Sequence, residues 1–154
     1  MRKNKPIHIF FLILSVVTVL FIWANSCLGR GASSEQSGVV RGFLQNFFEL
    51  IGLPVNVTMD VVRKIAHFAE FFLLGVEITL YTVWGRGIVG YDVVNHIGTV
   101  FAVGFVDETI QIFSKRGPAI TDVWLDVFGG VVAIVLVIAC YYLSTAGKKK
   151  RSRS

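Results

Sequence analysis

Acidic, basic and amide side chains recur at helical spacing inside apolar stretches of this sequence. Lys64, His67 and Glu70 follow one another at steps of three residues, and Glu77 comes seven residues later. At about 100° of rotation per residue, this spacing places all four side chains on one side of a helix. Ionisable side chains are costly at the centre of a bilayer, so they usually face the interior of a helix bundle. The pattern therefore predicts one polar helix face, on which Glu77 lies deepest and has no evident partner.

Two later apolar stretches carry polar residues that we expect at the same depth. One stretch ends with Asp107, Glu108 and Gln111, and the next begins with Asp122 and Asp126, one helical turn apart. If consecutive stretches cross a membrane in alternate directions, these ends meet the start of the preceding polar helix near one membrane face. The predicted site, named the polar cluster, consists of Lys64, His67, Glu70, Asp107, Glu108, Gln111, Arg116, Asp122 and Asp126.

The polar cluster could support acid–base chemistry, anion binding or metal binding. Glu70 or Glu108 could act as a general base with His67 as the acid, and Arg116 could hold an anionic ligand through two parallel hydrogen bonds. His67 and Glu70 could instead share a metal ion, with Glu108 or Asp107 completing the shell. The sequence has no H-E-x-x-H motif, however, and the cluster has a single histidine. We therefore expect no metal and no cofactor, and the sequence assigns no catalytic residue.

A simpler alternative is that the polar groups satisfy one another and only fix the packing of the helices. Ser114 and Thr109 belong to no nucleophile motif, and the sequence contains no glycine-rich phosphate loop or dinucleotide fingerprint. The sequence alone therefore leaves open whether the protein is an enzyme.

The composition indicates which elements position these residues. The chain has 154 residues, of which 54% are hydrophobic and 16% charged, and its mean hydropathy is +0.67. This excludes a large soluble domain, because soluble domains carry nearer a quarter of charged residues. Apolar stretches of spanning length lie at about 7–28, 65–84, 93–113 and 123–143. We predict an all-α integral membrane four-helix bundle that forms a single domain over residues 1–154.

The segment between the first two predicted spans has a different pattern. It begins polar and then carries Val40, Phe43 and Phe47 at helical spacing, with charged residues on other faces. Gly52 and Pro54 end the pattern before it reaches spanning length. We predict an amphipathic helix lying in the membrane interface; the alternative is a lid packed over the bundle.

The net charge of +5 indicates orientation rather than affinity for nucleic acid. With both ends in the cytoplasm, nine Lys and Arg residues lie inside and six outside, and residues 147–154 form a basic cytoplasmic tail. We therefore predict a multi-pass protein with cytoplasmic termini and no nucleic-acid partner. In this topology Cys27 and Cys140 lie toward opposite faces, so we expect no disulfide between them within one chain.

Taken together, the polar positions resemble a known family. The resemblance rests on the polar cluster and also involves Phe71 and the segment Ser33–Ser37. The motifs occur in the order Lys64-x-x-His67-x-x-Glu70, Asp107-Glu108-x-x-Gln111, Arg116 and Asp122-x-x-x-Asp126-x-x-Gly129. This order and spacing resemble the VanZ-like family of small bacterial membrane proteins over nearly the whole chain, and Ser33–Ser37 resembles the serine-rich segment after the family's first span. Asp126 stands where the family usually has Asn, and Phe71 where Tyr is frequent, which bears on ligand specificity.

The resemblance implies a protein of the bacterial cell membrane and envelope. The family takes its name from a teicoplanin-resistance protein, so it implies an effect on susceptibility to glycopeptide antibiotics, although no reaction is established for it. The implied partners are the lipid bilayer and either a glycopeptide-related ligand or an anionic lipid-linked envelope precursor. Two alternatives are an intramembrane enzyme that acts on such a precursor and a membrane adaptor that binds another envelope protein. The oligomeric state cannot be predicted from the sequence.

Overall fold

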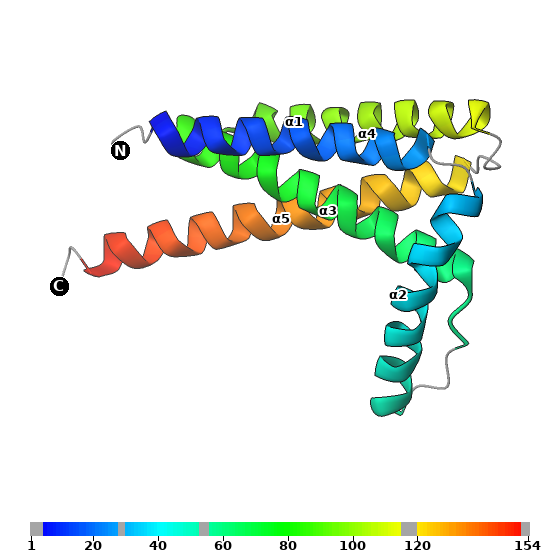
Figure 1. Cartoon of the computed structure of the whole chain (residues 1–154). Coiled ribbons are helices and arrows are strands. Elements are labelled where there is room, and N and C mark those ends of the chain that lie inside the picture. The colour runs from blue at the N-terminus through cyan, green and yellow to red at the C-terminus, as the bar shows by residue number, and fades with distance from the viewer. Residues whose placement is uncertain (1–4, 28–29, 53–55, 115–119, 152–154) are drawn as a thin grey trace.

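The computed structural model of the chain describes residues 5–27, 30–52, 56–114 and 120–151 (Figure 1). Within these ranges the chain is all-helical and contains no strand. The helices are α1 (Lys5–Cys27), α2 (Arg30–Leu50), α3 (Met59–Gly85), α4 (Gly90–Phe113) and α5 (Ile120–Arg151). Each of the four apolar stretches predicted as spans therefore lies within one helix, apart from a terminal residue of the first.

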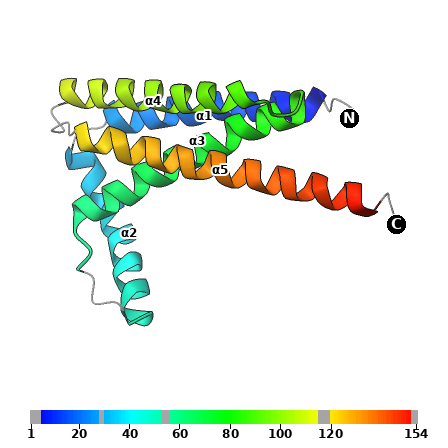
Figure 2. The same ribbon diagram turned by 180° about the vertical axis from the view of Figure 1, so that it is seen from behind.

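Four of the helices run lengthwise and pack against one another. α3 packs most extensively on α5 and next on α1, while α4 contacts α5, α1 and α3. Figures 1 and 2 show that α1 begins and α5 ends at the same end of the molecule. The start of α3, the end of α4 and the start of α5 lie at the opposite end. Cys27 and Cys140 are both free and exposed, and they form no disulfide with each other.

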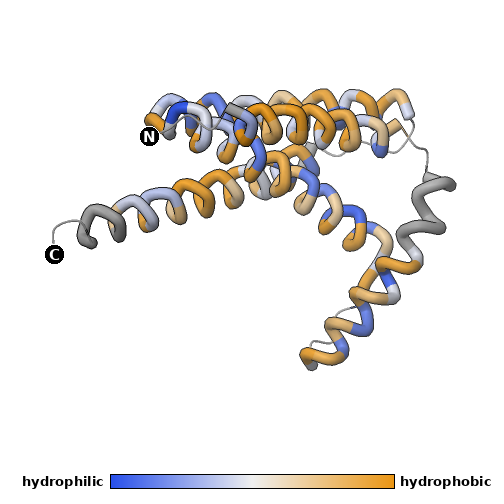
Figure 3. The backbone as a smooth tube through the Cα atoms, turned by 60° about the vertical axis from the view of Figure 1, so that its left-hand side comes forward, coloured by the Kyte–Doolittle hydropathy of each residue, from blue (hydrophilic) through white to orange (hydrophobic). Residues whose placement is uncertain are grey.

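In the described part of the chain, three helices are long and apolar enough to cross a membrane: α1 over Pro6–Cys27, α3 over its whole length and α5 over Asp122–Ala146. Figure 3 shows hydrophobic residues along most of α1 and the middle of α5. α4 has 24 residues but is not apolar enough to count as a candidate span, because polar side chains near both of its ends lower its mean hydropathy. The protein is thus a membrane protein with at least three candidate spans, and the crossing by α4 stays a prediction.

α2 differs from the other helices in its position, and it begins earlier than its apolar pattern. Among the described residues it contacts no helix other than α3, and it projects away from the lengthwise set (Figure 1). It also begins at Arg30, which places the polar segment Ser33–Ser37 inside the helix. Near its end the Gln45 Oε1 accepts a hydrogen bond from the backbone N–H of Val57 at 2.9 Å. This bond ties α2 to the segment before α3.

Close contact between α3 and α5 determines how their side chains are aligned along the bundle. A Cβ on Gly75 would lie 2.6 Å from the backbone oxygen of Gly130, and one on Gly129 would lie 2.6 Å from that of Phe68. Such distances leave no room for a side chain. The buried apolar core beside this contact comprises Ile22, Phe71, Leu74, Val100, Val103 and Ile134. The glycine contact therefore fixes α5 against α3 within the part of the chain that carries the polar residues.

Candidate functional site

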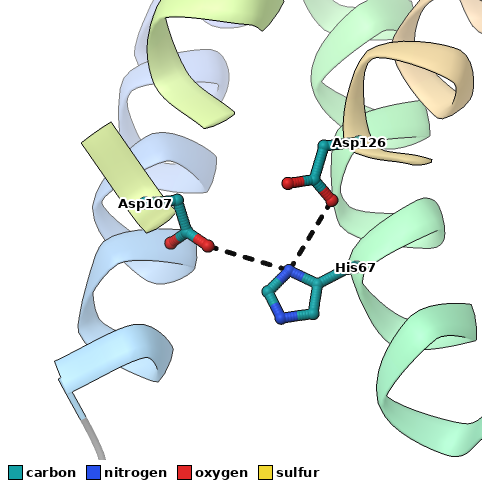
Figure 4. Close-up of side chains that lie close together, drawn as sticks. All are labelled: His67, Asp107 and Asp126. Atoms are coloured by element: carbon teal, nitrogen blue, oxygen red, sulfur yellow. Dashed lines mark ion pairs between the residues drawn. The ribbon is translucent and has the colours of Figure 1, made fainter. Parts of the chain in front are cut away.

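Three side chains from three helices meet in the interior of the protein. His67 comes from α3, Asp107 from α4 and Asp126 from α5. The Nδ1 atom of His67 lies 3.8 Å from Oδ2 of Asp107 and 3.8 Å from Oδ1 of Asp126 (Figure 4). Both carboxylates have 0% of their surface exposed, and His67 has 8%. We name these residues the His–Asp–Asp group; it forms the centre of the predicted polar cluster.

Gln111 orients one of the two carboxylates. Its Nε2 donates a hydrogen bond of 2.8 Å to Oδ2 of Asp107, one helical turn away, and a longer one of 3.4 Å to Oγ of Ser26. Ser26 lies on α1 and is fully buried. The amide thus holds the oxygen that faces His67 and joins a fourth helix to the site.

The other carboxylate oxygens of the group have fewer partners. Among the described residues, neither oxygen of Asp126 accepts a hydrogen bond, and neither does Oδ1 of Asp107. Buried polar groups are normally hydrogen-bonded, because leaving one unsatisfied costs roughly 1–3 kcal/mol. Asp126 lies close to α4, since a Cβ at Gly104 would be in ordinary van der Waals contact with the Asp126 carboxylate at 3.5 Å. The site therefore has unused capacity to hold a positive charge.

Further acids surround this centre. Glu70, Glu108 and Asp122 all lie close enough to Asp126 to interact with its charge. Glu70 is half-buried and accepts a hydrogen bond of 3.0 Å from Nδ2 of Asn25 on α1. Asp122 is buried and forms an ion pair of 3.2 Å with Arg63. Within the described part of the cluster acids outnumber bases, so its electrostatics favour a cation over an anion.

Glu108 connects the cluster to a cavity between α4 and α5. The cavity has a volume of about 560 Å³, and Glu108 contributes to its lining. Its other walls are mainly apolar and include Phe101, Phe105, Ile112 and Trp124. An amphiphilic molecule could therefore place an apolar chain in the cavity next to an acidic group.

One predicted cluster residue has no described contact with this centre, and another lies outside the described residues. Lys64 is exposed, and no described contact links it to the acids. Arg63 pairs with Asp122 in its place, because it precedes His67 by four residues and so lies closer to the buried face of α3. Arg116 lies outside the described residues, so its place in the polar cluster and its role in holding an anionic ligand stay predictions.

The same part of the chain matches a known protein family. A family model described as VanZ/LLP1 matches residues 10–141. The chain belongs to the VanZ/LLP1 family. The matched range includes every residue of the polar cluster and reaches from α1 into α5. No curated protein and no solved structure matches the chain significantly.

In the VanZ/LLP1 protein, two polar residues beside the candidate site were not revealed by the sequence pattern. Asn25 bonds Glu70 and Ser26 bonds Gln111, and both lie in the last turn of α1. In the sequence, these two residues look like the ordinary polar end of an apolar stretch. Only their depth could have linked them to the cluster, because the end of the first predicted span lies at the same level in the membrane.

The deeper acid of the VanZ/LLP1 chain has a simple partner. The Thr18 hydroxyl on α1 donates a hydrogen bond of 3.0 Å to Oε1 of Glu77, which is 1% exposed. Glu77 therefore contributes to the contact between α1 and α3 and is not part of the His–Asp–Asp group.

A separate polar region lies at the opposite end of the protein, around the connection between α3 and α4. Arg86 forms an ion pair with Asp92, and Asp92 also accepts a hydrogen bond from the Val89 backbone N–H at 2.8 Å. The hydrogen bond to Asp92 raises the pKa of Arg86. Thr82 and His96 share a buried hydrogen bond of 3.0 Å nearby. We name Thr82, Arg86, Asp92 and His96 the turn region.

Proposed function

We propose that this VanZ/LLP1 protein acts at the outer face of the bacterial cell membrane, where its polar cluster is the working site and affects susceptibility to teicoplanin-type glycopeptides. The observation that carries the proposal is the convergence of His67, Asp107 and Asp126 from three helices into a buried, incompletely satisfied group. An intramembrane cluster of this kind is costly to fold and marks function in membrane proteins generally. The link to glycopeptides comes from the family resemblance.

The proposed topology has four spans, α1, α3, α4 and α5, with both chain ends in the cytoplasm. The shared location of the start of α1 and the end of α5 supports it. Exposed apolar side chains on α4, such as Val94 and Phe105, suit contact with lipid. This orientation puts the His–Asp–Asp group toward the outer face.

α2 fits this topology as an amphipathic helix in the outer interface. Val39, Phe43 and Leu50 are 79%, 72% and 85% exposed, which is costly in water but favourable against lipid. Its separation from the lengthwise helices is the placement that such a helix needs.

The proposal is tested by comparing susceptibility with membrane abundance. Asp107→Asn and Glu108→Gln each keep the side-chain size and remove a charge from the cluster. We expect both to abolish the shift in teicoplanin inhibitory concentration that the wild type gives when expressed in a susceptible Gram-positive host. Membrane abundance, measured by immunoblot, should stay unchanged.

Asp60→Asn is the matched control, because Asp60 is an exposed acid in the first turn of α3. It should keep the full shift. If the cluster variants keep it too, the cluster is not the working site. If they disappear from the membrane, the alternative of a purely structural cluster is favoured.

The cavity between α4 and α5 favours a second candidate, an intramembrane enzyme that acts on an anionic lipid-linked envelope precursor. Its apolar walls suit an isoprenoid chain, and Glu108 could serve as a general base beside the headgroup. Incubation of the purified protein with labelled undecaprenyl-linked lipid, across several divalent metals, would test this. A product that depends on Glu108 supports catalysis, whereas no product under any of these conditions contradicts it.

A further inference from the structure

We propose that His67, Asp107 and Asp126 bind one divalent transition-metal ion of the Zn²⁺ or Mn²⁺ type. The inference deepens the proposed function and rests on it, because it assigns a ligand to the same polar cluster. It departs from the sequence expectation of no metal, and from the alternative in which His67 and Glu70 share an ion with Glu108 or Asp107.

The geometry is close to that of a metal site. One ligand atom from each residue of the His–Asp–Asp group lies within 4.8 Å of the other two. The distances of 3.8 Å from Nδ1 of His67 to the two carboxylate oxygens are too long for hydrogen bonds. Two ligands at about 2.1 Å from a tetrahedral ion stand about 3.4 Å apart. The two distances from His67 are therefore a few tenths of an ångström above ligand spacing, and the two carboxylates, which lie within 4.8 Å of each other, would have to approach by up to about 1.4 Å (4.8 Å less 3.4 Å) to complete the site. Figure 4 shows both aspartate side chains directed toward the His67 ring.

The charges also match a divalent ion. Two aspartates and a neutral imidazole carry two negative charges, which one divalent cation neutralises. The rival is an imidazolium between the aspartates, which leaves one negative charge uncompensated in a buried site. An ion would in addition give Asp126 the partner that neither of its fully buried oxygens finds among the described hydrogen bonds. The lack of hydrogen bonds to Asp126 is an observation separate from the clustering of the acidic residues.

The ligand types narrow the choice of ion. An imidazole nitrogen favours first-row transition metals, whereas Ca²⁺ requires six to eight oxygen ligands. Gln111 holds Asp107 by a hydrogen bond, which is the kind of support that metal-binding carboxylates usually receive. Three protein ligands leave a coordination position open, as in catalytic rather than structural zinc sites.

The experiment uses the full chain purified in mild detergent and stripped of metal with a chelator. Co²⁺ serves as the probe, because its visible absorption reports nitrogen and oxygen ligation, and elemental analysis gives the stoichiometry. We expect one equivalent of Co²⁺ in the wild type, displaced by Zn²⁺. Asp126→Asn and His67→Gln should weaken binding more than about 100-fold, beyond the 10- to 100-fold typical of supporting residues such as Gln111.

His96→Gln is the matched control, because His96 is also buried but bonds Thr82 in the turn region. It should bind Co²⁺ as the wild type does. The inference is overturned if the wild type takes up no stoichiometric ion, a result that does not depend on the folding of any variant. It is also overturned if folded Asp126→Asn and His67→Gln protein, eluting as the wild type does in size-exclusion chromatography, binds Co²⁺ with unchanged affinity.

The same variants separate this inference from the proposed function. A wild type without metal whose susceptibility shift still requires Asp126 would refute the metal site and leave the cluster as the working site. A wild type with one bound ion whose shift survives Asp126→Asn would support the metal site and refute the proposed function.

Discussion

The two ends of the lengthwise helices both bury charged residues but treat them differently. In the turn region, Asp92 is 2% exposed, forms an ion pair with the Arg86 guanidinium and accepts a hydrogen bond from the Val89 backbone N–H. In the His–Asp–Asp group, Asp126 is 0% exposed and accepts no hydrogen bond among the described residues. A satisfied buried charge holds a fold together, whereas an unsatisfied one costs stability and is retained for another reason. The contrast agrees with the proposal that the turn region is structural and the His–Asp–Asp group is the working site.

The largest effect should come from the contact that positions the polar cluster. Gly75→Ala drives a Cβ into the Gly130 backbone, where it cannot be accommodated by a rotamer change. We expect a loss of roughly 1–3 kcal/mol in stability, seen as a lower melting temperature in detergent. Gly98→Ala is the control, because a Cβ at Gly98 meets nothing within 4 Å. Equal melting temperatures for the two variants would mean that α3 and α5 are not in backbone contact.

The turn region should be the more sensitive end to loss of a charge. Asp92→Ala removes the partner of Arg86 and the acceptor for the Val89 N–H at the start of α4. By analogy with lost helix caps, we expect a cost of about 1–2 kcal/mol in thermal unfolding. Asp60→Ala, at an exposed first-turn acid of α3, should cost less. A reversed order would remove the structural role assigned to the turn region.

The deep contact between α1 and α3 should respond more modestly. Thr18→Val keeps the side-chain shape but removes the hydroxyl that bonds Glu77. The expected cost is about 1 kcal/mol, the usual size for one hydrogen bond. Thr99→Val is a suitable control, because the Thr99 hydroxyl is exposed and bonds only its own helix, at the Asn95 carbonyl. An unchanged melting temperature for Thr18→Val would show that Glu77 does not depend on this bond.

The smallest change, and the one of opposite sign, is expected in the His–Asp–Asp group. In metal-free protein, Asp126→Asn removes a buried carboxylate that lacks a hydrogen bond, so stability should stay equal or rise slightly. Thermal unfolding with and without a chelator measures this directly. A clear loss of stability in metal-free Asp126→Asn would place Asp126 among the structural residues and erase the contrast between the two ends.

The sequence predicted those features that depend on periodicity and depth. Apolar runs located the four lengthwise helices, and alternate crossing placed His67, Asp107 and Asp126 at one level, where the structure brings them together. It did not predict the side-chain partners Thr18, Asn25 and Ser26. Their contacts depend on how α1 is rotated and tilted against its neighbours, which the spacing within one helix does not determine.

Two further features escaped prediction for local reasons. Arg63 and Lys64 are adjacent bases, and only the packed position of α3 shows that Arg63 pairs with Asp122 while Lys64 is exposed. α2 begins at Arg30, before its apolar pattern starts, because a helix can continue through polar residues without a buried face to mark it.

The different roles proposed for the two buried polar ends can be tested by one paired measurement. Asp126→Asn and Asp92→Asn are expressed in the same susceptible host, and teicoplanin inhibitory concentration is divided by membrane abundance. We predict that Asp126→Asn loses the susceptibility shift at normal abundance, whereas Asp92→Asn loses abundance but keeps the shift per molecule. The opposite pattern, with normal function per molecule in Asp126→Asn and lost function at normal abundance in Asp92→Asn, would contradict the account.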